Sequence, residues 1–303
     1  MSIDAPSPER AGNALLWAGI LAISAMWGSS FLLAKLAVAT VSPASLAAFR
    51  GGLSAIVLLA VFAAAGRSLL PRTGEIGFAL VLGTLSGWLP NLLTNLALGS
   101  IDSARAGMLN GTTPLFVMLL AHLALRDERI TATTLLGMGT GFAGLLLLVG
   151  PGGGGSLIGH LLMVAVALCY AAGTVFARHR RPADPARLAF LQQSCSGLGA
   201  LALALGIDGG ISMPPPGATW LVLLLLGALG TAAPMVVYLW LLGRTTATRV
   251  ATVGYLQPIW AAALGAIILG ERLTPAALAG CALVLGGVWL TSRTVRRSPD
   301  RSG

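Results

Sequence analysis

The sequence repeats a pattern of glycines, prolines and charges at a distance of just under half its length. The repeated positions, each displaced by 144 residues, are Gly83, Pro90, Arg105 and Pro114, which recur as Gly227, Pro234, Arg249 and Pro258. A Glu-Arg-x-Thr turn at residues 128–131 also recurs at 271–274. Both copies lie in strongly apolar surroundings, so the chain is predicted to fold as two related halves with the same succession of helices and breaks.

Composition places both halves in a membrane. Of the 303 residues, 56% are hydrophobic and 10% are charged, whereas soluble domains carry roughly 25% charged residues. A chain this apolar cannot cover a water-facing surface, and a spanning helix needs about 20 apolar residues. Apolar runs between turn residues predict an all-α integral membrane protein with ten transmembrane helices, at 14–39, 44–65, 75–98, 104–125, 132–150, 156–177, 186–206, 218–242, 248–269 and 275–292.

The distribution of positive charge predicts the orientation of these helices. Four of the 19 Lys and Arg residues fall on the side opposite the N-terminus, namely Lys35, Arg50, Arg105 and Arg272. Cytoplasmic loops carry the excess of Lys and Arg, so both termini are predicted to lie in the cytoplasm, with the protein in a bacterial inner membrane. The same loop bias explains the net charge of +9 without a nucleic-acid partner.

Each half holds five predicted helices, which is an odd number. The second half must therefore enter the membrane from the opposite face, and the duplication is predicted to be an inverted repeat. The expected organisation is a cytoplasmic tail at 1–13, a first repeat at 14–150, a glycine-rich linker at 151–155, a second repeat at 156–292 and a basic cytoplasmic tail at 293–303.

Several segments resemble those of a known transporter family. They are Ala25–Phe31 with Arg50 after it, Pro114 followed by Asp127–Thr131, and Gln257-Pro258 followed by Gly270–Thr274. In these residues the chain is similar to the drug/metabolite transporter superfamily, in particular its EamA-type members, and most like the bacterial YddG-type amino-acid exporters. The resemblance implies two inverted five-helix halves around a central cavity, alternating access, and small metabolites such as amino acids, purines, drugs or sugar derivatives as substrates.

Polar and aromatic side chains share one face of the third predicted helix, because Trp88, Asn91 and Asn95 follow one another at helical spacing. Asparagine both donates and accepts hydrogen bonds, which suits a zwitterionic amino acid. Polar side chains inside a bilayer face the bundle interior, so these residues are predicted to line a substrate site. Hydrogen bonding that holds helices together is the alternative.

Prolines interrupt four of the predicted helices and are expected to act as hinges. They are Pro90, Pro114, Pro234 and Pro258. A proline frees the carbonyl four residues earlier, and such a carbonyl can accept a substrate ammonium group. A plain kink, satisfied by a neighbouring hydroxyl or water, is the alternative. The predicted site residues beside these prolines are Asn110, Thr113, Tyr255 and Gln257.

The set of predicted site residues is completed by Trp27, Ser30, Tyr170 and Tyr238. Helix one carries Trp27, Ser30 and Phe31 on one face, helix six carries Tyr170 and Thr174 at matching positions, and helix eight carries Tyr238. Aromatic rings can stack on an apolar or aromatic substrate. Core packing or an interfacial belt is the alternative for each ring.

The positions of the carboxylates predict how transport is driven. All ten Asp and Glu residues fall at span ends, in loops or in tails, whereas proton-coupled carriers usually keep one within the membrane. Facilitated diffusion or exchange is therefore expected, rather than proton symport through a buried carboxylate. Efflux of cationic drugs would also favour a carboxylate within the membrane. Amino acids, aromatic or apolar ones included, are therefore predicted as substrates, with drugs or other metabolites as the alternative.

Functions outside transport find less support. The sequence has no HExxH, P-loop or GxSxG motif, and its three cysteines lack metal-ligand spacing, so neither an enzyme nor a metal or cofactor is expected. A scaffold or receptor would have few polar residues at the midplane. Small faces are formed by Gly137, Gly141, Gly144, Gly280, Gly286 and Gly287. They are expected to pack within each half, with a homodimer interface as the alternative, so the protein is predicted to be a monomer or a weak homodimer. The expected partners are the lipid bilayer and a small-molecule substrate.

Overall fold

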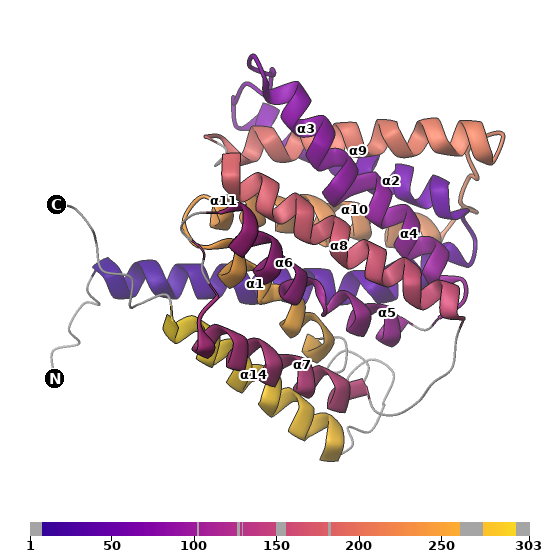
Figure 1. Cartoon of the computed structure of the whole chain (residues 1–303). Coiled ribbons are helices and arrows are strands. Elements are labelled where there is room, and N and C mark those ends of the chain that lie inside the picture. The colour runs from indigo at the N-terminus through magenta and orange to yellow at the C-terminus, as the bar shows by residue number, and fades with distance from the viewer. Residues whose placement is uncertain are drawn as a thin grey trace, which may run out of the picture.

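All regular structure in the described part of the chain is helical. The computed structural model describes residues 8–101, 103–125, 128, 130–149, 156–180, 183–260 and 275–294. The helices form a bundle in which α1 (Pro8–Val38) runs lengthwise, with α7 (Ala132–Val149) and α14 (Pro275–Thr294) paired along one edge (Figure 1). α1 begins and α14 ends on the same side of the bundle, at the left of Figure 1.

The two halves of the chain follow the same succession of helices. Between α1 and α7 lie α2 (Pro43–Ala64), α3 (Glu75–Gly83), α4 (Leu89–Leu98), α5 (Ser103–Asn110) and α6 (Thr113–Ala124). The second half consists of α8 (Leu157–Arg180), α9 (Pro185–Ile207), α10 (Ala218–Gly227), α11 (Ala233–Leu242), α12 (Ala247–Ala251), the helical residues 253–260 and α14. Among the described residues, six helical segments are long and apolar enough to cross a membrane.

Large apolar side chains cover the outside of the bundle. Ile56 is 62% exposed, Leu123 74% and Ile207 71%, and leaving each of them in water rather than burying it would cost about 1.5–3 kcal/mol. A bilayer removes this cost, because lipid tails are themselves apolar. The exposed apolar surface therefore agrees with a membrane protein.

Two long helices are broken by a π-helical turn. Thr84–Trp88 (η1) separates α3 from α4, and Ala228–Ala232 (η2) separates α10 from α11. Pro90 and Pro234 lie in the first turn of the helix that follows, where the missing N–H is harmless. Two further breaks occur, at residues 111–112 before α6 and at 252 after α12. Each proline-bearing segment is therefore interrupted, while the hinge role of the prolines stays a prediction.

Corresponding helices of the two halves begin with the same kind of N-terminal cap. Ser42 Oγ caps α2 by accepting from the Ser45 N–H at 3.3 Å, and Asp184 Oδ1 caps α9 by accepting from the Arg187 N–H at 3.1 Å. In both helices a proline occupies the first turn, which suits its φ angle. The loops that follow these helices also correspond, because a left-handed backbone, which glycine adopts readily, occurs at Gly66 (φ 66°) and Gly74 (φ 83°) and, 143 residues later, at Gly209 (φ 69°) and Gly217 (φ 111°).

α2 and α9 cross at glycines. A Cβ added at Gly51 would lie 2.5 Å from Gly197 N and 2.8 Å from Gly197 Cα. A Cβ added at Gly197 would lie 2.7 Å from Gly52 N. Helix backbones approach this closely only where small residues meet, so the crossing depends on the absence of side chains at these positions.

Replacing Gly51 with alanine is expected to destabilise the protein by about 1–3 kcal/mol, because the added methyl group forces the two backbones apart. Gly52 is the matched control, since a Cβ there would meet no atom within 4 Å and alanine favours a helix. Thermal unfolding in detergent should show a lowered midpoint for G51A and an unchanged or raised one for G52A. Equal midpoints would contradict the crossing.

Glycines also join α7 to α14, but across the two halves. A Cβ at Gly144 would lie 2.7 Å from Gly280 O, and one at Gly287 would lie 2.5 Å from Gly141 N. The expectation that these faces pack within a half is therefore wrong, because each half supplies one of the two helices. Gly144 and Gly287 are thus covered by the same chain, whereas a Cβ at Gly286 would meet no atom within 4 Å, and the weak homodimer stays a prediction.

Some predicted features lie outside the described residues. These are the terminal segments 1–7 and 295–303, the linker 151–155, the end of the ninth predicted helix at 261–269 and the second Glu-Arg-x-Thr turn at 271–274.

Candidate functional site

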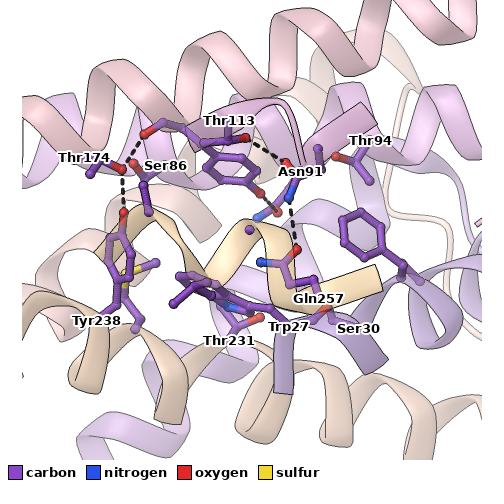
Figure 2. A pocket seen from close by; sticks show the side chains of 18 of the residues that line it. Trp27, Ser30, Ser86, Asn91, Thr94, Thr113, Thr174, Thr231, Tyr238 and Gln257 are labelled. Carbon is purple, nitrogen blue, oxygen red and sulfur yellow. Dashed lines mark hydrogen bonds between the residues drawn. The ribbon is translucent and has the colours of Figure 1, made fainter. Parts of the chain in front are cut away.

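A cavity lies in the centre of the bundle, between the interrupted helices (Figure 2). The empty space between its lining atoms is about 880 Å³, a volume that includes space open to solvent. Its walls come from α1, α2, η1, α4, α5 and α6 of the first half and from α8, η2, α11, α12 and residues 253–260 of the second. A ligand in this cavity would touch both halves at once.

Two buried side chains, one from each half, bind the carbonyls that the prolines of α4 and α11 leave free. The carbonyl four residues before the proline of α4 is that of Ser86, and Gln192 Nε2 of α9 donates to it at 3.4 Å. The matching carbonyl before the proline of α11 is that of Gly230, and Arg50 Nη2 of α2 donates to it at 3.3 Å. Each half therefore stabilises the π turn of the other.

The residues four positions before Pro114 and Pro258, whose carbonyls these prolines are predicted to free, also lie at the cavity. Asn110 and Gly254 both line it, and a Cβ added at Gly254 would lie 3.9 Å from Asn110 O and 3.2 Å from Pro114 Cδ. The segments that carry these residues thus meet closely at the cavity wall. Whether either carbonyl accepts a substrate ammonium group stays a prediction.

Polar side chains form a hydrogen-bonded set along the wall. Asn110 Nδ2 donates to Gln257 Oε1 at 3.1 Å, and the Thr113 hydroxyl donates to Asn110 Oδ1 at 3.4 Å. The Tyr170 hydroxyl makes a long hydrogen bond of 3.5 Å to Asn91 Oδ1. Within the described part of the chain, the side-chain nitrogens of Asn91 and Gln257 donate to no protein group, so both are available to a ligand.

Aromatic rings form an apolar wall beside these groups. The rings of Trp27 and Tyr238 pack with centroids 5.1 Å apart and planes tilted by 56°. A short hydrogen bond joins the hydroxyls of Thr174 and Tyr238, and the two side chains point toward one another in Figure 2. Phe31 and Met235 add further apolar surface to the cavity. The site can therefore hold a molecule with both polar and apolar parts.

The structure brings eight of the eleven predicted site residues to this cavity. They are Trp27, Ser30, Asn91, Asn110, Thr113, Tyr170, Tyr238 and Gln257. Their proximity is a structural fact, whereas contact with a substrate stays a prediction.

Trp88 and Asn95 lie away from the cavity, contrary to the expectation of one shared face. The Trp88 indole Nε1 donates to Thr84 Oγ1 at 3.1 Å, and its ring packs against Gly199 of α9. The non-helical angles of η1 fall at residues 86 and 87, before Trp88, whose own backbone is helical with φ −61° and ψ −41°, so it is the packing of its ring on α9 that separates Trp88 from the cavity. Asn95, one turn further along α4, donates through Nδ2 to Pro43 O at 3.0 Å and so joins α4 to the start of α2.

Tyr255 is also outside the cavity. Its hydroxyl donates to Met138 O at 3.3 Å, and its ring packs against Gly141 of α7. Gly254 and Gln257, three residues apart, share the helix face that lines the cavity, which turns the intervening Tyr255 toward α7.

Five polar or charged lining residues were not among the eleven predicted site residues, although Thr174 was noted beside Tyr170 on the sixth predicted helix. They are Arg50, Ser86, Thr94, Thr174 and Thr231. Thr94 follows Asn91 by three positions, so helical spacing alone contained a signal for it. The cavity position of Arg50 had no such signal, because a basic residue near the start of a helix is usually counted with the adjacent loop.

No carboxylate is found among the described residues that line the cavity. Glu128 is buried, with 6% exposure, but it lies in the loop after α6 and accepts hydrogen bonds from Ala247 N at 2.6 Å and Thr248 N at 3.0 Å. Its burial was not expected from its loop position. The described residues also include no group of three or more His, Cys, Asp or Glu side chains that could hold a metal ion.

Comparison with known proteins identifies the family. The EamA-like transporter family matches residues 13–150 and matches again over residues 157–293. The chain belongs to the EamA-like transporter family. It is thus a multi-pass membrane transporter, and the double match shows that each half of this EamA-like transporter carries the family pattern.

Relatives of this EamA-like transporter align over most of its length. The uncharacterized transporter YoaV of Bacillus subtilis is 22% identical over 92% of this chain and 97% of its own. A probable amino-acid metabolite efflux pump of Salmonella typhimurium is 27% identical over 93% and 97%, respectively. The uncharacterized inner membrane transporter YedA of Escherichia coli is 21% identical over 86% and 84%.

A solved crystal structure shares the fold of this EamA-like transporter. It covers 94% of this chain and 98% of its own, with a TM-score of 0.77 and 22% sequence identity. At this identity the likeness concerns the fold alone.

Proposed function

We propose that the chain crosses a bacterial inner membrane ten times, as two inverted five-helix repeats with both termini in the cytoplasm. The double family match supports the repeat, as do the paired left-handed glycines. The common side of the start of α1 and the end of α14 supports an even number of crossings. Arg50 is buried at the cavity, so it is no longer counted among the positive charges of the outer loops. The difference in positive charge between the cytoplasmic and the outer side is therefore larger than the sequence suggested.

We further propose that the protein carries amino acids, aromatic or apolar ones included, through the central cavity. The observation that carries this proposal is the lining, which combines the amides of Asn91, Asn110 and Gln257 with the rings of Trp27 and Tyr238. Amides can donate to a carboxylate and accept from an ammonium group, and aromatic rings bind apolar side chains. The Salmonella relative named as a probable amino-acid metabolite efflux pump adds support.

Alternating access is the mechanism we propose for this movement. The cavity walls include all four interrupted segments, two from each half. Breaks in otherwise stiff helices allow their two ends to move separately, and transporters commonly rock one repeat against the other around such a site. Pro90, Pro114, Pro234 and Pro258 lie at or near these breaks and are proposed as the hinges.

Energy for transport is proposed to come from the substrate gradient, by facilitated diffusion or exchange. A proton relay through the cavity would need a titratable carboxylate there, and the described lining residues include none. The proposal therefore excludes uphill accumulation driven by a pH gradient through this site.

Purified protein in liposomes tests both proposals. Labelled amino acids and cationic dyes are offered separately, with empty liposomes as the control, and then again under an imposed pH gradient with the membrane voltage clamped. Saturable flux of an aromatic or apolar amino acid, without uphill accumulation, is expected. Dye flux without amino-acid flux would favour a drug carrier, and no flux of any solute would favour a scaffold or receptor. Uphill accumulation would contradict the proposed energetics.

A further inference from the structure

We infer that Arg50 binds the carboxylate of the transported substrate, so that an anionic group is required for tight binding in the cavity. This inference rests on the proposed function in taking the cavity as the substrate site. It adds a residue and a chemical requirement that the proposal itself does not contain.

Arg50 is placed inside the bundle by its position in α2. It is the eighth residue of this 22-residue helix, which puts it roughly 10 Å from the first residue at a rise of about 1.5 Å per residue. The side chain lines the cavity and the residue is 8% exposed. A permanently charged group is therefore held within the membrane-spanning part of the protein.

The protein solvates only part of this guanidinium. Nε donates to Thr231 Oγ1 at 2.8 Å and Nη2 donates to Gly230 O at 3.3 Å. No hydrogen bond from Nη1 and no ion pair of Arg50 is found within the described residues, and no Asp or Glu stands among the described lining residues. The positive charge at the cavity is thus not neutralised by a described carboxylate.

A buried arginine that no described carboxylate neutralises calls for an anion. Arginine does not lose its proton in proteins, and charged groups inside membrane proteins are paired or line a functional pathway. The guanidinium fork matches a carboxylate, which can accept two parallel hydrogen bonds. A substrate that carries a carboxylate would supply the missing charge, whereas a cation would be repelled.

The second half shows that capping the π turn does not require a charge. Gln192 is the counterpart of Arg50, each being the eighth residue of a helix that begins with proline, α9 and α2. Its neutral amide binds the Ser86 carbonyl as Arg50 binds that of Gly230, but Gln192 does not line the cavity. The charge of Arg50 is therefore not needed to cap the π turn. Of the two capping residues, the charged one is the one that lines the cavity, where a ligand can reach it.

Arg50→Gln separates the two roles, because glutamine can keep the hydrogen bond to the π turn while it removes the charge. Three ligands compete with labelled phenylalanine, or with whichever labelled solute the wild type transports: phenylalanine, its amide and 3-phenylpropionate. The amide lacks the carboxylate, and 3-phenylpropionate lacks the amine. Affinity for the two carboxylate ligands is expected to fall about 10- to 100-fold in R50Q, the effect of losing charge-assisted hydrogen bonds, while affinity for the amide changes less than about twofold.

Two further variants make the result decisive. Arg50→Lys keeps the charge without the fork and is expected to recover part of the affinity for carboxylates. Gln192→Leu removes a cap without touching the cavity, so it should lower thermal stability and leave the preference for carboxylates unchanged. Equal losses for all three ligands in R50Q, or no loss at all, would overturn the inference.

The same data distinguish this inference from the proposed function. If the wild type binds 3-phenylpropionate through Arg50 but transports no amino acid, the amino-acid proposal fails and the carboxylate site stands. If it transports amino acids and R50Q keeps the preference for carboxylates, the carboxylate site fails and the proposed function stands.

Discussion

Replacement of Glu128 by alanine is expected to destabilise the protein by about 3–5 kcal/mol, the range found when one partner of a buried charge pair is removed. The Glu128 carboxylate accepts from Ala247 N, Thr248 N and Thr248 Oγ1 at 2.6–3.0 Å. It also lies 3.7 Å from Arg178 Nε. Alanine would leave two N–H groups at the start of α12 without their acceptor and would remove the negative charge beside a buried arginine.

Thermal unfolding in detergent measures this effect, with two controls. Glu128→Gln keeps an oxygen acceptor and the shape of the side chain, so it should be less damaging than alanine. Asp208→Ala removes an exposed carboxylate that accepts from the Ser42 hydroxyl at 2.6 Å and should cost less than about 1 kcal/mol. An unfolding midpoint for E128A equal to that of D208A would show that the contact between the loop after α6 and α12 contributes little to stability.

Filling the cavity is expected to stop transport while the protein stays folded. Thr94 of α4 lines the cavity, so a tryptophan at this position would extend into the space that the substrate needs. Because empty volume is available there, the larger side chain should not strain the core as it would in a closely packed site. Flux in liposomes should fall by about tenfold or more, since the bound substrate loses its productive position.

Leu96 provides the matched control on the same helix. It lies two residues from Thr94 and is 44% exposed on the apolar outside of the bundle, so Leu96→Trp adds the same ring toward lipid. Normal flux in L96W together with normal thermal stability in both variants would assign the loss in T94W to the cavity. Normal flux in T94W would mean that the substrate takes another path.

The helix breaks were predictable because the residues that cause them act locally. A proline removes one N–H donor and frees one carbonyl wherever a helix contains it. What happens to that carbonyl is not local. The partners of Ser86 and Gly230 are Gln192 and Arg50, which are 106 and 180 residues away in sequence. No pattern around the prolines indicated them.

Among the site residues, too, some positions follow from local rules and others depend on distant contacts. Asn91, Asn110 and Gln257 reach the cavity because amides inside a bilayer turn to the interior. Trp88 follows the same helical spacing but packs its ring against Gly199 of α9, a contact with a distant helix that the spacing could not indicate. Thr174 also lines the cavity, although its hydroxyl donates to Tyr170 O of its own helix at 2.7 Å.

Charged residues show most clearly what depends on tertiary structure. Arg50 was counted with the outer loops because it lies close to the start of α2, yet its side chain is buried at the cavity. Glu128 was placed in a loop, and it is buried because α12, about 120 residues later in the sequence, begins against it. Burial in both cases is decided by a distant segment.

Counterflow in liposomes tests the central claim most directly, because a carrier that alternates between two sides exchanges substrates across the membrane. Liposomes loaded with unlabelled phenylalanine are diluted into a trace of labelled phenylalanine, with no pH gradient or voltage imposed. We predict transient accumulation of label above equilibrium in the wild type and its loss in T94W. Uptake that only approaches equilibrium, at the same rate in loaded and unloaded liposomes, would contradict alternating access through this cavity.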